Sequence, residues 1–332
     1  MHRGVVGRCI DHTETAAQPP KGFVMKRFCL PCAAVAFVLI CAAAASSARA
    51  QQTGFVLFPN APPLLLFGPQ DNTPVPNDDI AVHPVTDPYY AEDSFVSTNL
   101  RFVYAYQPFS DHSILHGGVA QVFAPQLHVA ITPQLEFLAN KDGFITLHPG
   151  VFHEDGWNDV AVGLKWNFLQ DRHDQFYSAL GVGYEFPWGE SDVLQNKEEL
   201  RLWASADKGF GKLHVGGTFN YFFDTGNQGV DGAGDHLASD VHVDYRFSDF
   251  VSPFVESNFY YVTKSHNAVL PIQGADLTNL GDGVRDEIVT VAVGAEIRPL
   301  QNLALRAAWE KNVTHPSDIL DYRVTLSAIL TF

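Results

Sequence analysis

Apolar and polar residues alternate along most of the chain from residue 97 onward, which is the pattern of β-strands with two unlike faces. In residues 213–223 the apolar positions fall at every second residue and alternate with His214, Gly216, Thr218 and Asn220. Residues 158–168 and 303–310 repeat the alternation, and their charged residues fall almost wholly on one face. The pattern predicts amphipathic strands.

The final twelve residues, DYRVTLSAILTF, carry the alternation to the end of the chain. One face holds Tyr322, Val324, Leu326, Ala328, Leu330 and Phe332. A strand with lipid on one side and water on the other requires this division. The tail resembles the C-terminal signal by which bacterial outer-membrane barrels are handed to their assembly machinery. That resemblance implies that Phe332 is an assembly signal and that the barrel-assembly machinery is a partner.

Short turns and longer polar loops separate the predicted strands in alternation. Five short connections, such as residues 132–133 and 299–302, alternate with six long ones, such as residues 264–285, and together they separate twelve strands. Both ends of this array lie on the short-turn side, as in bacterial barrels with periplasmic termini. We therefore predict an all-β fold, a transmembrane antiparallel up-and-down β-barrel of about twelve strands over residues 97–332. The stretch 117–140 is hard to divide, so ten or fourteen strands stay open, and a secreted β-sandwich or β-helix would show similar alternation.

Residues 1–50 have the three-part pattern of a secretory signal peptide. Basic residues precede an uncharged apolar run, and small residues follow up to Ala50, after which we place the cleavage site. Met25 opens the pattern and is an alternative start of the protein. A lipoprotein signal through Cys41 is the less favoured alternative, because a bulky residue precedes this cysteine.

Residues 51–96 differ from the strand region in their proline content. Eight of the seventeen prolines beyond residue 50 lie in residues 51–95, and proline cannot donate to a sheet ladder. The apolar run 62–67 (PPLLLF) could plug the lumen, pack on the periplasmic rim or remain disordered. We expect a loosely ordered arm, either periplasmic or a plug.

Composition removes several classes of function. All four cysteines lie in residues 1–50, so the mature chain has no thiol for a disulfide, a thiolate metal site or a cysteine nucleophile. Beyond residue 50 the chain carries 15 basic and 35 acidic residues, a formal net charge of −20. Such a chain is unsuited to nucleic acid. No apolar stretch of the mature chain approaches the roughly 20 residues of a membrane-spanning helix, so strands would make any crossing.

If the apolar faces meet lipid, the polar faces enclose a lumen. We expect its pore-lining residues to be Arg101, Lys165, Glu185, Arg201, Asp244, Arg246, Glu256, Glu296, Arg306, Glu310 and Arg323. A twelve-stranded barrel is wide enough for a narrow aqueous path constricted by such charges. The alternative is that the charges pair across the lumen and close it.

His242, Asp244 and Arg246 share one face of a predicted strand. An Asp beside a His could orient it for base catalysis, but no serine on the neighbouring strands is placed as a nucleophile, and an ion-pair ladder explains the three residues more simply. No HExxH pattern occurs, so we expect no metal site. The acidic loops 224–235 and 276–287 could bind Ca²⁺ but lack the EF-hand spacing. We expect neither a cofactor nor enzyme activity.

Residues 156–169 (GWNDVAVGLKWNFL) resemble the segment G-x-x-D-x-x-x-G-x-K-x-x-F of an outer-membrane transporter family linked to the meta-cleavage pathway of phenol degradation. Asp159, Gly163 and Lys165 fall on that pattern, and Gly294 with Glu296 is similar in style. The resemblance implies an outer-membrane channel for small organic solutes, with aromatic or hydrophobic molecules among the candidates.

These observations together predict a passive channel or facilitator in the outer membrane of a Gram-negative bacterium. Its partners would be the lipid bilayer, lipopolysaccharide and a small-molecule solute. Two alternatives stay open: an outer-membrane enzyme of lipase or protease type, and a structural or surface-interaction barrel with a closed lumen. The sequence does not determine the solute, the open state or the oligomeric state.

Overall fold

The computed structural model describes residues 81–113, 115–141, 143–171, 173–193, 198–226, 234–264, 287–314 and 319–332. The predicted signal peptide, residues 51–80 of the arm and most of both acidic loops lie outside the described residues. In the part of the chain that is described, no helix is long and apolar enough to cross a membrane.

Antiparallel strands make up almost all of the described structure after residue 98. They are β1 (Asn99–Pro108), β2 (Gly118–Ala130), β3 (Leu135–Ala139), β4 (Phe144–Pro149), β5 (Glu154–Trp157), β6 (Val160–Asp171), β7 (Phe176–Phe186), β8 (Glu199–Phe210), β9 (Leu213–Asp224), β10 (Asp235–Tyr245), β11 (Val251–Lys264), β12 (Glu287–Leu300), β13 (Leu303–Asn312) and β14 (Tyr322–Thr331). A single 3₁₀ turn, η1 (Ser191–Val193), lies between β7 and β8.

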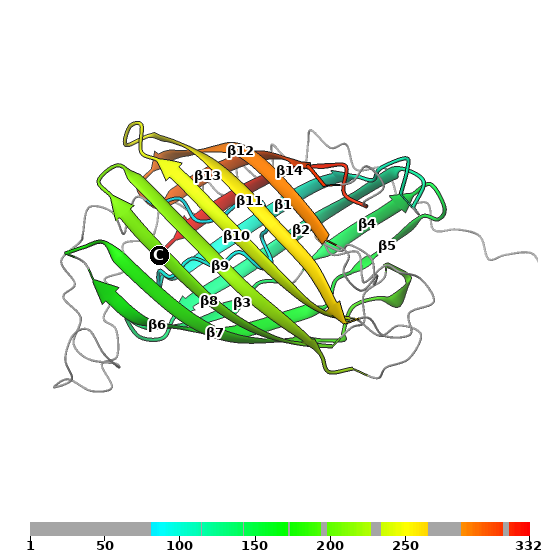
Figure 1. The fold of residues 1–332 in the computed structure, drawn as a ribbon, viewed down its shortest axis with the longest axis horizontal. Helices are drawn as coiled ribbons and strands as arrows, with labels where there is room; N and C mark the ends of the chain where they lie inside the picture. The colour runs from blue at the N-terminus through cyan, green and yellow to red at the C-terminus, as the bar shows by residue number, and fades with distance from the viewer. Residues whose placement is uncertain are drawn as a thin grey trace, which may run out of the picture. The chain divides into compact units, whose positions relative to one another are not determined.

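The sheet closes on itself, because β1 pairs with both β2 and β14. β3 and β4 pair with different parts of β2, while β5 pairs with β4 and β6 with β3. β3 and β4 therefore share one strand position of the wall, and β5 and β6 share the next. The fourteen segments make a closed barrel of twelve strands (Figure 1). The predicted fold class and strand number are confirmed.

Two adjacent wall strands break at the same level of the barrel. Residues 140–143 separate β3 from β4, and residues 158–159 separate β5 from β6. Gly143 passes so close to β2 that a Cβ atom would lie 2.5 Å from the carbonyl oxygen of Phe123. The backbone N–H of Asn158 donates to the carbonyl of Gly143 (2.9 Å), which joins the two breaks. Because of these breaks, the number of strands in and after residues 117–140 was hard to predict from the sequence.

The two faces of the wall differ as the alternation predicts. On β10, Val241 is 52% exposed, whereas its neighbours Asp240 and His242 are 4% and 1% exposed. The same contrast recurs around the wall, where outward apolar side chains include Phe123, Leu164, Val182, Leu202, Phe219, Val255, Val293 and Leu326. An apolar exterior and a polar interior are the arrangement of a barrel that sits in lipid.

Both ends of the barrel sequence lie at the rim that carries the short turns. Asn99 at the start of β1 pairs with Thr331 at the end of β14. The turn between β8 and β9 is among the short ones, and its Gly211 has a φ of +69°, a left-handed conformation that glycine adopts without a steric penalty. The strand ends that the longer connections join lie at the opposite rim, so the predicted alternation of short and long connections holds.

Candidate functional site

The interior of the barrel collects the charged side chains that the sequence assigns to a lumen. Ten of the eleven predicted pore-lining residues are buried on the inward face: Arg101, Lys165, Glu185, Arg201, Asp244, Glu256, Glu296, Arg306, Glu310 and Arg323. They come from β1, β6, β7, β8, β10, β11, β12, β13 and β14, so most of the wall contributes.

Arg246 is the exception among the predicted pore-lining residues. β10 ends at Tyr245, so Arg246 lies in the turn to β11. Its side chain is 29% exposed and forms an ion pair with Asp249 (2.6 Å), which is 92% exposed. The inward periodicity of a strand does not extend past its last residue, and Arg246 therefore belongs to the rim and not to the lumen.

Phe332 lies beyond the end of β14 and is 40% exposed. Its backbone N–H donates to the carbonyl of Thr98 (3.0 Å), which holds the chain end against the start of β1. The outward neighbour Leu326 on β14 is 44% exposed, whereas Arg323 is buried. The two faces of β14 therefore follow the expected division up to Ser327, whereas Ala328 and Leu330, which were expected on the outward face, are buried. The role of Phe332 in assembly stays a prediction.

Residues 81–98 run through the inside of the barrel as an irregular segment with a turn at residues 87–91, seen as the cyan trace within the wall in Figure 1. Val82, Val85, Thr86 and Ser94 are each no more than 1% exposed. We call residues 81–98 the lumen segment. Among the places that the sequence left open for the arm, this part occupies the lumen, and the apolar run 62–67 lies outside the described residues.

Carboxylates of the wall bind the backbone of the lumen segment. Glu256 accepts the N–H groups of Val85 and Thr86, both at 2.8 Å, and the Thr86 hydroxyl at 2.5 Å. Asp207 accepts the N–H of Ser94 at 2.6 Å. An irregular segment that joins no sheet needs other acceptors for its buried N–H groups, and these carboxylates provide them through strong, charge-assisted hydrogen bonds.

Arg201 binds the carbonyl side of the lumen segment. Its guanidinium donates to the carbonyls of Tyr89 (3.0 Å) and Tyr90 (2.6 Å) and to the side-chain oxygen of Asn220 (2.8 Å). The guanidinium also lies over the Trp203 ring, 4.3 Å from its centroid. The planar fork of donors and the aromatic contact suit arginine and not lysine, so this residue clamps the middle of the lumen segment.

A second cation, Lys165, faces acidic groups of both the wall and the lumen segment. Its Nζ atom lies 3.3 Å from Glu136, 3.6 Å from Asp93 and 3.9 Å from Glu92. Lys165 is fully buried, and a buried charge is tolerated only where opposite charges compensate it. Because two of its three partners belong to the lumen segment, removal of that segment would leave Lys165 with less compensation.

Other charged pairs close within the wall. Arg323 and Glu310 form a buried ion pair at 2.6 Å, and Lys141 binds Glu185 at 2.7 Å. Glu310 and Arg323 face each other on the neighbouring strands β13 and β14, so such pairs do not decide between a constriction by charges and pairing across the lumen, and both stay predictions. Between Tyr89, Tyr90 and the wall a cavity of about 20 Å³ remains. That is the space of about one water molecule, too little for an organic solute.

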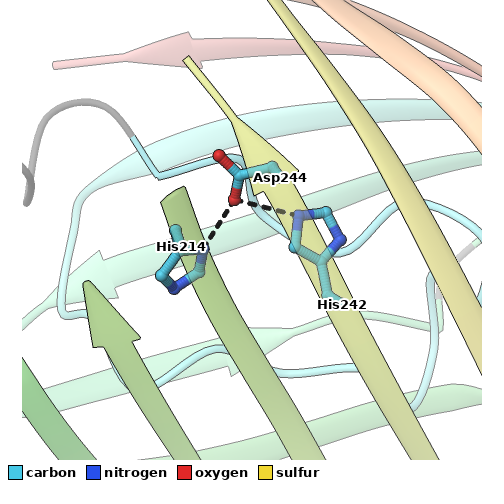
Figure 2. Close-up of side chains that lie close together, drawn as sticks. All are labelled: His214, His242 and Asp244. Carbon is cyan, nitrogen blue, oxygen red and sulfur yellow. Dashed lines mark hydrogen bonds and ion pairs between the residues drawn. The ribbon is translucent and has the colours of Figure 1, made fainter. Parts of the chain in front are cut away.

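The histidines form a cluster that the predicted trio did not anticipate. His214 Nδ1 lies 2.6 Å and His242 Nε2 lies 3.2 Å from the same oxygen of Asp244, as Figure 2 shows. The sequence grouped His242 and Asp244 with Arg246. In the structure Arg246 is not part of this cluster, and the third member is His214 from β9. His214 pairs with Asp244 across β9 and β10, which are joined by a long loop, so their register could not be read from the sequence.

Carboxylates occupy the second nitrogen of each ring in this cluster. His214 Nε2 lies 3.0 Å from Asp207, and His242 Nδ1 lies 2.7 Å from Glu256. Both nitrogens of each imidazole therefore face an acceptor, which leaves neither ring with a nitrogen directed at a substrate. This geometry does not favour base catalysis by His242 and Asp244, the alternative that their spacing in the sequence suggested.

No family model matches the sequence, and no curated protein matches it. Solved structures of outer-membrane barrels do match the fold. The COG4313 outer membrane channel from Pseudomonas putida F1 is 13% identical, with coverage of 76% of this chain and 100% of that chain and a TM-score of 0.55. The NanC porin is 12% identical, with 71% and 100% coverage and a TM-score of 0.46. At this identity the likeness shows the fold alone, and the fold is that of an outer-membrane barrel.

Proposed function

We propose that this protein is an outer-membrane channel for the passive passage of small solutes and that the lumen segment closes it. The observation that carries the proposal is the position of residues 81–98, most of which are buried inside a closed barrel whose inward face is polar. A channel needs a wetted path, and the charged wall provides one once the lumen segment moves aside.

The contacts of the lumen segment support a reversible closure. Its backbone groups bind side chains such as Glu256, Arg201 and Asp207 and lie outside the strand ladders, except that the carbonyl of Thr98, next to β1, accepts the N–H of Phe332. Water can replace such hydrogen bonds, whose net contribution, as bonds to charged groups, is about 1.5–3 kcal/mol each. Departure of the segment therefore leaves every strand pairing of the barrel intact.

We further propose small aromatic molecules as the solute class. The inward face beneath the lumen segment carries Trp203, Phe222 and Phe254, all buried, beside the cations Arg201 and Lys165. Tyr90 of the lumen segment already packs on Phe222, with the ring centroids 4.5 Å apart. Aromatic side chains and cations together favour flat aromatic solutes. The same class is implied by the resemblance to the transporter family linked to phenol degradation.

A reversible tether tests the closure directly. Ser94 of the lumen segment and Ser205 of β8 place their hydroxyl oxygens 3.2 Å apart, so a Ser94→Cys, Ser205→Cys double variant should form a disulfide with little backbone movement. No cysteine occurs beyond Cys41 in the natural chain. We expect liposome swelling with small aromatic solutes to be low in the oxidised variant and to recover on reduction.

The two single-cysteine variants are the matched controls, since neither can form the tether. Equal swelling rates before and after reduction in the double variant would exclude the lumen segment as the closure. Absence of swelling by the natural protein and by the reduced variant, with both folded, would exclude the channel and favour the barrel with a closed lumen.

A further inference from the structure

Three potential metal ligands converge inside the barrel near the short-turn rim. They are His214 Nδ1, His242 Nε2 and an oxygen of Asp244, which all lie within 4.8 Å of one another. His214 is the second residue of β9, and Asp244 is the last residue but one of β10. Two neighbouring strands therefore hold the three side chains on one patch of the inward face, as Figure 2 shows.

The outer partners of both histidines match those of metal-bound imidazoles. A metal-ligating histidine almost always presents its other ring N–H to a carboxylate, a carbonyl or water, which fixes the ring and its tautomer. His214 does so through Nε2 to Asp207 (3.0 Å), and His242 does so through Nδ1 to Glu256 (2.7 Å). This outer shell is independent of the converging ligand atoms and orients both rings toward Asp244.

The electrostatics of the patch also favour a cation. Among the described residues, the ion pairs of Asp207, Asp244 and Glu256 are made with the two histidines and with no lysine or arginine. Three buried carboxylates beside two imidazoles leave a negative balance at this place in the lumen. A divalent ion would offset that balance more directly than surface charges can.

We propose that His214, His242 and Asp244 form a binding site for a divalent transition metal of the zinc class. Zinc accepts nitrogen and oxygen ligands at about 2.0–2.2 Å in tetrahedral geometry, which separates the ligand atoms by roughly 3.3 Å. The observed separations from Asp244 are 2.6 Å to His214 and 3.2 Å to His242. The two histidine nitrogens lie within 4.8 Å of each other, so the side chains would have to move to bring all three ligand atoms to this spacing, and water would complete the coordination.

Occupation of this site would act on the lumen segment, because the same oxygen of Asp244 accepts the N–H of Val82 (3.4 Å). Glu256, which orients His242, also holds Val85 and Thr86. The metal site and the docking of residues 82–86 therefore share two carboxylates. The binding of the metal does not depend on the channel function proposed above and can be measured without any transport assay.

The test uses the purified, folded mature chain in detergent, titrated with Zn²⁺ by calorimetry and with Co²⁺ by visible absorption. We expect saturable binding of one ion per chain and the intense absorption bands of a tetrahedral Co²⁺ site. His242→Gln and His214→Gln should each weaken the affinity at least tenfold, with folding checked by circular dichroism. His214 lies at the margin of the cluster, so its variant serves if His242→Gln does not fold.

The matched control is His148→Gln. It removes a partly exposed histidine that is paired with Asp155 (2.9 Å) and lies near His153, with 5.2 Å between the tilted rings' centroids. Affinity should stay unchanged in this variant. The proposal is overturned if the natural chain shows no saturable binding. It is also overturned if both lumen variants bind as tightly as the natural chain, or if binding is lost in His148→Gln instead.

Discussion

Glu256 is the carboxylate on which the docking of the lumen segment depends most, so its removal gives the sharpest prediction. Its two oxygens accept three donors of that segment, the N–H groups of Val85 and Thr86 and the Thr86 hydroxyl. Glu256→Gln keeps the shape of the side chain but removes its charge and replaces one acceptor with a donor. The docked state then loses the bonds to the ionised group, whereas the weaker contact of Glu256 with His242 is common to the docked and undocked states.

The expected magnitude follows from the number of bonds. Hydrogen bonds to a charged group contribute about 1.5–3 kcal/mol each, and part of that remains because the amide oxygen still accepts. A loss of about 1 kcal/mol for each of the three bonds gives about 3 kcal/mol in total. Since about 1.4 kcal/mol is a factor of ten, the undocked fraction should rise about 100-fold.

Thiol labelling measures that fraction. Val82 is fully buried, so a Val82→Cys variant reacts with a maleimide only while the lumen segment is undocked, and Glu256→Gln should raise its labelling rate about 100-fold. Glu310→Gln is the matched control, because Glu310 is buried and binds Asn258, Thr290 and Arg323 of the wall. A labelling rate in Glu256→Gln no higher than in this control would refute the assigned role of Glu256.

Two further predictions concern the faces of the wall. Val241→Arg places a charge on the outward face of β10, where Val241 is 52% exposed, and should lower the free energy of unfolding from vesicles by about 2–4 kcal/mol; an unchanged urea midpoint would show that this face does not meet lipid. Arg246→Gln should leave the single-channel current unchanged, whereas Arg306→Gln should raise the open fraction severalfold, because Arg306 donates to the carbonyl of His83 (2.9 Å). An equal open fraction in the two variants would contradict the assignment of Arg246 to the rim and of Arg306 to the lumen.

Local sequence patterns predicted the wall of the barrel in detail. Alternation of side chains on a strand depends only on residues two apart, so the inward position of Arg201 and the outward position of Leu202 could be read directly. Short turns also carry register. The turn between β10 and β11 sets His242 opposite Glu256, and the turn between β8 and β9 brings His214 near Asp207.

The sequence pattern failed where a local rule ended. In the sequence, Arg246 continues the two-residue spacing of the inward residues His242 and Asp244. In the structure, however, β10 ends at Tyr245 and the chain turns. The break between β3 and β4 follows from the close approach of Gly143 to β2, which has no signature in the alternation. The pairing of His214 with Asp244 spans a long loop, whose length leaves the register open.

The sequence by itself determined most of the strands, their two faces and the charges available to a lumen, because each depends on near neighbours along the chain, and it limited the strand number to about twelve. Only the tertiary structure decided what fills that lumen. Thr86 and Glu256 are 170 positions apart in sequence, and proline content alone leaves the arm free to lie anywhere. Closure of the barrel brings wall carboxylates and guanidinium groups around residues 81–98. Peptide groups of that segment bind these side chains because they lie outside the strand ladders.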